Sequence, residues 1–176
     1  MNADSVVTTR DDGDHSREHL WQIVRGTRFA MVTTIGEGDA LRSRPLTTQN
    51  HRHDIGDKLF FFVPAAGEVA DDLRHDPRVG VVYADTDKDR YVSISGVARV
   101  VHDLRRQAEL WSPLAQGWFP GGPDDPGLRL LEVQMESAEY WDVKASKMTQ
   151  LLRMAKAAVV RRPPTDIGEH RDVPVR

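Results

Sequence analysis

Two arginines on one predicted strand are the residues whose type and spacing point most directly to chemistry. Residues 41–48 read LRSRPLTT, and because alternate side chains of a strand share a face, Arg42 and Arg44 lie side by side. Their guanidinium groups repel each other unless an anion or a carboxylate lies between them. Pro45 cannot donate to a sheet ladder, which places the strand at an edge or a mouth of a sheet. Two guanidinium groups beside threonine hydroxyls suit a planar, phosphorylated ligand.

The same pattern has a second interpretation, which the sequence leaves open. A solvated sheet edge whose arginines pair with aspartate or glutamate side chains would have the same sequence, and most runs of surface charge are of that kind. The chain has no glycine-rich phosphate loop and no motif of paired carboxylates. Spacing alone therefore predicts an anion site at most, without a catalytic constellation.

The spacing of His15 and His19, one helical turn apart, is one that can chelate a metal. No further ligand type lies close to them in the sequence, and a solvated helix face explains the pair without a metal. His51 and His53 fall in a polar loop, where exposed histidines are common. We therefore expect no metal site.

Length and composition limit the classes of protein to consider. The chain has 176 residues, enough for one domain with a real core, and its net charge of −3 argues against a nucleic-acid surface. It contains no cysteine, which excludes disulfides, thiolate metal sites and a cysteine nucleophile. The N-terminal residues are polar and no apolar run approaches membrane-spanning length. We therefore expect a cytoplasmic protein without a signal peptide or a membrane segment.

The elements that must position the arginines are short strands separated by turns. Apolar and alternating runs predict strands over 29–35, 41–48, 58–63, 78–83, 91–101, 128–135 and 138–142. Periodic apolar positions predict helices over 15–24, 67–75, 104–114 and 144–162. We expect residues 1–14 to form a disordered tail and residues 163–176 a polar tail. Strands with such short connections are typical of a mainly β fold, a small antiparallel β-barrel with inserted helices.

A loop rich in glycine and proline, residues 116–126, carries two adjacent aromatic side chains, Trp118 and Phe119. Exposing two such side chains together is costly in free energy. We therefore expect both to pack on a partner surface or on a ligand.

Several segments, taken in chain order, carry a family resemblance. The earlier ones are RPL at 44–46, LFFF at 59–62, DPRV at 76–79 and YVSISG at 91–96. The later ones are more specific: LWSP at 110–113, WFPGGPDDP at 118–126, AEYWD at 138–142, MAKA at 154–157 and GEH at 168–170. Over residues 17–171 the chain resembles the pyridoxamine 5′-phosphate oxidase-like split barrels, and the later segments resemble their general stress protein branch.

The resemblance implies a six-stranded antiparallel split barrel of the FMN-binding type, over residues 15–143. Such proteins dimerise and hold FMN in clefts at the dimer interface. The implied partners are a second copy of the chain and a small-molecule substrate, which the family sets by loop shape rather than by a motif. The flavin carries the electrons, so no side chain needs to act as an acid or a base.

The resemblance also implies which residues hold the cofactor. It places Arg44, with Arg42 beside it, on the flavin phosphate. It places the backbone of Pro45, Leu46 and Thr47 along the isoalloxazine edge. A tricyclic ring needs apolar and aromatic walls, and its phosphate needs a charged clamp.

The remaining implied positions line the ribityl and phosphate side, face the ring, or close the site. Phe62 and Val63 are implied to line the ribityl and phosphate side, and Tyr91 and Ser93 to face the ring. Trp118 and Trp141 are implied to close the site. One of the two tryptophans is implied to come from the other subunit. Packing in the core or in a dimer interface is the alternative role for both.

The chain departs from the family at the phosphate side. Relatives carry a threonine or serine after the third strand, then a serine and a lysine or arginine entering the next helix. The corresponding residues here are Val63, Gly67, Glu68 and Val69, with Val69 implied to point toward the phosphate. A hydroxyl and a cation are missing and a negative charge is added, so weaker FMN binding is expected. The backbone N–H groups at the start of that helix still suit an anion.

Two functions from different classes follow. The first is an FMN-dependent oxidoreductase associated with the stress response. The second is a non-catalytic module that binds or stores a flavin or another flat anion. The phosphate clamp distinguishes them, because a site that is short of cations binds FMN weakly or not at all.

Overall fold

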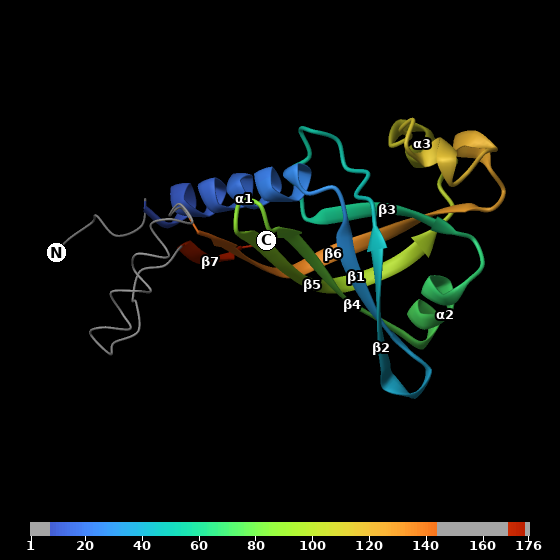
Figure 1. Cartoon of the computed structure of the whole chain (residues 1–176), viewed down its shortest axis with the longest axis horizontal. Coiled ribbons are helices and arrows are strands. Elements are labelled where there is room, and N and C mark those ends of the chain that lie inside the picture. Colours follow the sequence, from blue (N-terminus) through green and yellow to red (C-terminus); the bar gives the residue numbers. More distant parts are fainter. Residues whose placement is uncertain (1–7, 144–168, 175–176) are drawn as a thin grey trace.

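An antiparallel sheet that curls into a split barrel forms the body of the protein (Figure 1). The computed structural model describes residues 8–143 and 169–174. The hydrogen-bonded order is β2-β1-β4-β5-β6-β3, and β7 pairs with β6 outside that path. The predicted mainly β, six-stranded antiparallel split barrel is thus confirmed. The strands are β1 Ala30–Gly36, β2 Ala40–Leu46, β3 Lys58–Pro64, β4 Asp76–Asp85, β5 Arg90–Val101, β6 Leu128–Asp142 and β7 Glu169–Val173.

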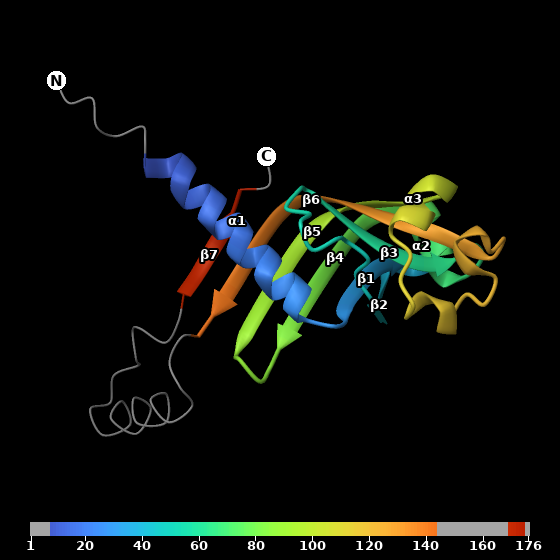
Figure 2. The same cartoon turned by 90° about the horizontal axis from the view of Figure 1, so that it is seen from above.

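The described residues form three α-helices: α1 Thr8–Gly26, α2 Glu68–His75 and α3 Leu104–Glu109. Figure 2 shows α1 crossing one face, where it contacts β7, β5 and β4. α2 packs on β1, β4 and β5 and shares the same core, so both helices cover what we call the inner face. α3 ends before the predicted residue 114, because Pro113 has no N–H to continue a helix. None of the described helices is long and apolar enough to cross a membrane.

The main core lies between the inner face and these two helices. Strand alternation supplies one side of it: Val79, Val81 and Tyr83 of β4 are buried, whereas Val82 between them is exposed. Burying each such side chain stabilises the fold by roughly 1.5–3 kcal/mol relative to exposure. The other side comes largely from α1, with four buried side chains, Leu20, Trp21, Ile23 and Val24.

β3 is buried on both faces, as its apolar sequence predicts. Leu59, Phe61 and Val63 join the main core. Phe60 and Phe62 point the other way, into a second cluster beneath α3 and the loop after it. The other members of that cluster are Leu110, Ala115, Leu128 and Leu130, with Trp111 and Phe119 packed against them.

Both ends of the chain are more regular than the sequence predicts. α1 begins at Thr8 rather than at His15, so residues 8–14 are helical where a disordered tail is predicted. Once the later turns are packed on the sheet, each residue added before them gains a helical hydrogen bond. β7 forms within the predicted polar tail because it covers an open edge of β6, and Val173 is buried in the main core. The predicted helix over 144–162 lies outside the described residues.

β6 is one strand of 15 residues rather than two strands joined by a turn. The predicted break is a β-bulge: Ser95 pairs with Ser137 but Gly96 pairs with Met135, which leaves Glu136 as the extra residue. Glycine is required at position 96, since a Cβ there would lie 2.1 Å from a backbone oxygen of β6. The bulge bends the long strand and lets one strand serve both halves of the barrel.

Candidate functional site

A buried carboxylate lies between the two arginines of β2. Asp72, on α2, accepts a hydrogen bond from Arg42 Nη1 at 3.0 Å and another from Arg44 Nη2 at 2.8 Å. Thr34 Oγ1, on β1, donates a third at 2.6 Å. The Asp72 side chain is 2% exposed, against 43% for Arg42 and 20% for Arg44. We call these four residues the Asp72 cluster.

Strand register brings the cluster together. Arg42 is the ladder partner of Thr34, which is fully buried. Arg44 is the ladder partner of Val32, which belongs to the main core. Both arginines therefore lie on the inner face, as the alternation of the sequence predicts. α2 packs against β1 and turns Asp72 toward them.

The cluster keeps Asp72 ionised. Burial by itself raises the pKa of the carboxyl group, because the charged form loses water. Hydrogen bonds from Thr34 and Arg44, and the positive charges of Arg44 and Arg42, outweigh burial, so the pKa of Asp72 lies below its ordinary value of 3.8. Arg44 Nη1 also donates to Thr34 Oγ1 at 2.8 Å, so the hydroxyl accepts one hydrogen bond and donates another.

Glu68, the first residue of α2, adds a second carboxylate. Its Oε2 lies 3.1 Å from Arg44 Nη2, and its side chain is 72% exposed. Two positive charges are therefore faced by two negative charges at hydrogen-bonding distance. Of the two interpretations of this strand, pairing with carboxylates describes both arginines in the structure.

The predicted residues of the phosphate side are packed into the protein. Val63 is fully buried in the main core, and Val69 is 9% exposed and belongs to the same core. The expectation that Val69 points toward a phosphate is thus wrong, because its place in the first turn of α2 faces the sheet. Phe62 packs on Trp111 and Phe119, with ring centroids 5.7 and 6.5 Å apart.

Four of the residues predicted to contact or close around a ring share the opposite, outer face of the sheet. Pro45 and Ser93 lie in one row, which crosses the sheet from β2 through β1 and β4 to β5. Tyr91, two residues before Ser93 and on the same face, is the ladder partner of Trp141 on β6. The structure thus brings Tyr91, Ser93 and Trp141 together and leaves Pro45 on the same face at the sheet edge, beyond Met31 and Val82. The thickness of the sheet separates all four from the Asp72 cluster.

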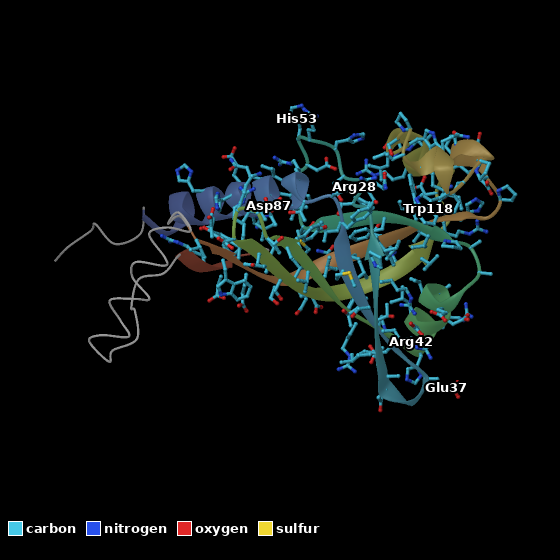
Figure 3. The ribbon with its side chains drawn as sticks, in the orientation of Figure 1. Arg28, Glu37, Arg42, His53, Asp87 and Trp118 are labelled. Atoms are coloured by element: carbon cyan, nitrogen blue, oxygen red, sulfur yellow. The ribbon has the colours of Figure 1, made fainter. Side chains whose placement is uncertain are left out.

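The last three predicted residues lie elsewhere. Leu46 packs against the main core from the inner face. Thr47 lines a pocket at the end of α1. Trp118 is 83% exposed on the loop that follows α3, and Figure 3 shows it well away from Arg42. Of the two loop aromatics, Phe119 packs within the chain rather than on a ligand or partner.

Sequence reasoning missed Asp72 and Thr34. A signal for Asp72 was present, since Val69, Asp72 and Leu73 are spaced to share one helix face and an acid on an apolar face needs a partner. Thr34 gives no such signal, because a threonine on a buried strand is ordinary.

The histidine pair of α1 shows no metal geometry. His19 Nε2 lies 2.7 Å from Asp142 Oδ2, and its ring packs at 4.9 Å from that of Tyr140. His19 therefore joins α1 to β6. Across residues 8–143 and 169–174, no three histidine, aspartate or glutamate side chains gather closely enough to hold a metal ion.

We predict that Asp72→Asn lowers the free energy of unfolding by about 2 kcal/mol at neutral pH, because it removes the buried counter-charge of both arginines and leaves Arg44 only the exposed carboxylate of Glu68. The folded-state pKa of Asp72 is depressed, so this contribution is present above pH 3.8 and is lost as the pH falls below that value. Urea unfolding should therefore show a difference from the wild type that shrinks in acid.

Asp71→Asn is the matched control, because Asp71 is the preceding residue of α2, is 61% exposed and pairs only with Arg74 in the described structure. Its effect should stay within about 0.5 kcal/mol at any pH. Equal effects of the two substitutions would contradict the role given to Asp72.

Comparison with known proteins identifies relatives over most of the chain. Residues 15–165 match the family model described as pyridoxamine 5′-phosphate oxidase like. Protein bli-3 of Neurospora crassa is 24% identical over 161 residues, which cover 86% of this chain and 77% of that protein.

Two solved structures show how far the similarity extends. A putative general stress protein 26 from Jannaschia sp. CCS1 superposes with a TM-score of 0.69 at 25% identity, covering 91% of this chain and 97% of that one. The general stress FMN/FAD binding protein of Xanthomonas citri gives a TM-score of 0.66 at 28% identity, covering 76% and 92%. The chain therefore belongs to the pyridoxamine 5′-phosphate oxidase-like family, with general stress proteins among its structural neighbours.

Proposed function

We propose that the protein binds a flavin, FMN, at the interface of a homodimer, and that the bound flavin serves an oxidoreductase reaction. The observation that carries the proposal is the outer face of the sheet. There Tyr91 and Trp141, which the family resemblance assigns to the ring, are ladder partners, and Ser93 lies next to them on the same face. Pro45 lies on the same face at the sheet edge, with Met31 and Val82 between it and Ser93. The Xanthomonas citri relative, described as FMN/FAD binding, supports the flavin. Its general stress description supports a stress role, and a cytoplasmic location stays a prediction from the sequence.

The ring of a flavin fits this face. Tyr91 and Trp141 supply an aromatic pair, and Ser93 supplies a small side chain in the adjoining row. Flat heterocycles bind to such walls with few polar contacts. When bound, the flavin supplies the electron transfer, while these side chains hold the ring and exclude water from it.

The phosphate of FMN does not fit the Asp72 cluster in its present form. Arg42 and Arg44 already donate to Asp72, and Glu68 stands at the exposed side of Arg44. A phosphate would have to displace or approach these carboxylates, which costs as much as it gains. We therefore propose that the ring supplies most of the affinity for FMN.

The homodimer is proposed from apolar side chains that the monomer leaves exposed on the outer face. Met31 and Val82 are ladder partners there, 42% and 41% exposed, and Phe29 just before β1 is 49% exposed. Such a contiguous apolar patch on an exposed face of a sheet is typical of a protein–protein interface. A second copy of the chain would cover the patch and enclose a ring bound on it.

A second candidate function is a non-catalytic module that binds or stores a flavin or another flat ligand. The neutralised arginines of the Asp72 cluster favour it, because they give the site little hold on a phosphorylated cofactor. Purified protein that is yellow and bleaches with NAD(P)H would support the oxidoreductase. Yellow protein that keeps its colour would support the binding module.

We predict that FMN and riboflavin bind with dissociation constants within about threefold of each other, because the phosphate meets no net positive charge.

Glu68→Gln should strengthen FMN binding by about threefold to tenfold and leave riboflavin binding unchanged, and the gain should shrink at high salt. Flavin-fluorescence titrations measure both. Glu136→Gln, an exposed residue of β6, is the control for the charge change alone. FMN binding a hundred times tighter than riboflavin would contradict the proposal that the ring supplies most of the affinity. If neither ligand binds, the proposal that the protein binds a flavin is wrong.

We predict that Val82→Asp converts the dimer to a monomer, because it places a charge in the middle of the proposed interface. Leu104→Asp is the matched control, since Leu104 on α3 is 47% exposed and is not part of the patch formed by Phe29, Met31 and Val82. Light scattering at micromolar concentration should give a dimer for the wild type and the control. A wild-type monomer would refute the homodimer.

A further inference from the structure

A pocket of about 580 Å³ opens at the C-terminal end of α1, away from the Asp72 cluster. Figure 3 shows Arg28, one of its lining residues, near that helix end, whereas Arg42 lies by α2 on the far side of the molecule. Its volume is within the range usual for small-molecule sites. The walls come from α1, the turn into β1, the β2–β3 loop and Leu114: Trp21, Gln22, Val24, Arg25, Gly26, Thr27, Arg28, Thr47, Thr48, Asn50, Arg52 and Leu114.

The charged side chains of this lining are all positive. Arg25, Arg28 and Arg52 line the pocket, and no aspartate or glutamate of residues 8–143 and 169–174 does. Arg25 donates to the backbone oxygen of Asp54 at 3.2 Å and lies over the Trp21 ring. Within the described part of the chain, neither Arg28 nor Arg52 forms an ion pair. The nearby carboxylate of Asp54 is turned back onto its own loop, where it accepts from the backbone N–H of His51 at 3.1 Å.

This is the reverse of the Asp72 cluster. There, two arginines are neutralised by two carboxylates. Here, three arginines line a concave space, with Arg28 lying over the Phe29 ring beside it, and none of the described lining residues is a carboxylate. Like charges gathered around one pocket repel each other, and an anion between them relieves that repulsion. Arg28 and Arg52 are therefore more available to an anionic ligand than the two arginines of the Asp72 cluster.

The framework of the pocket is fixed by buried groups. Trp21 is fully buried and its indole N–H donates to the Gly56 oxygen at 3.2 Å. Asn50 ties the β2–β3 loop to β3, accepting from Phe60 N at 2.9 Å and donating to the Lys58 oxygen at 2.9 Å. Leu114 is 61% exposed and offers apolar surface beside the arginines. A pocket with a firm frame, an apolar side and a cationic rim suits an anion that carries an apolar body.

We propose that this pocket binds a small organic anion, with its carboxylate or phosphate group on Arg28 and Arg52 and its apolar body against Leu114. Thr47 is shared with the residues that the family resemblance places along the isoalloxazine edge. If the proposed flavin lies along Thr47, the anion in this pocket is the molecule that reacts with the flavin. That assignment as a substrate rests on the proposed function, whereas the binding of an anion to the pocket does not.

The test is an NMR titration of the flavin-free protein. Phenyl phosphate and benzoate probe the phosphate and carboxylate sources of the anion, and benzyl alcohol probes the ring alone. The amide signals of Thr27, Thr47 and Asn50 should shift and saturate with at least one of the two anions, with a dissociation constant of about 1 mM or tighter. Benzyl alcohol should not saturate them. Equal binding of the alcohol would overturn the proposal.

Arg28→Gln and Arg52→Gln should each weaken binding of the anion by about fivefold, the amount expected for one partly exposed charged contact. Arg105→Gln removes the same charge from α3, where the side chain is 86% exposed, and should leave the affinity unchanged. Identical affinities in all three variants would contradict the proposal that Arg28 and Arg52 hold the anion. Flavin binding, measured separately by fluorescence, decides the proposed function without affecting this result.

Discussion

The carboxylate of Asp72, held between Arg42 and Arg44, is the interaction on which the arrangement of this protein depends. A buried carboxylate costs several kcal/mol unless charges and hydrogen bonds replace its water. Here two guanidinium groups and the Thr34 hydroxyl do so, at 2.6 to 3.0 Å. Because β2 is an edge strand, it has ladder bonds on one side only. The cluster joins it to α2 and holds both against β1.

That constraint divides the molecule into three regions of different chemistry. At α2 the two arginines of β2 form ion pairs with carboxylates of the same chain. On the outer face, aromatic and apolar side chains lie in register, which suits a flat ring and a second protomer. At the end of α1, three arginines that form no ion pair with any described carboxylate line a pocket. In this chain the ring keeps the surroundings that the family resemblance implies, whereas an anionic group would find better surroundings at the end of α1 than at Arg42 and Arg44.

Much of the fold could be predicted because it depends on local pattern. Alternation correctly placed both arginines on one face and buried β3 on both sides, since side-chain direction in a strand follows from its period. The rest depends on contacts between distant segments. The meeting of Asp72 with β2, the pairing of β7 with β6 and the bulge at Gly96 join residues far apart in the sequence. Val69 was misplaced for the same reason: the family alignment gave its helix turn, but only packing decides which way that turn faces.

The central claim is that Arg42 and Arg44 stay hydrogen-bonded to Asp72 whether or not a flavin is present. An NMR titration of the Asp72 side-chain carboxyl carbon, with and without saturating FMN, tests it most directly. The account predicts a pKa below 3.8 that FMN leaves unchanged, because the phosphate does not take the guanidinium groups from Asp72. A pKa at or above 3.8 in the free protein, or one that rises when FMN binds, would contradict it.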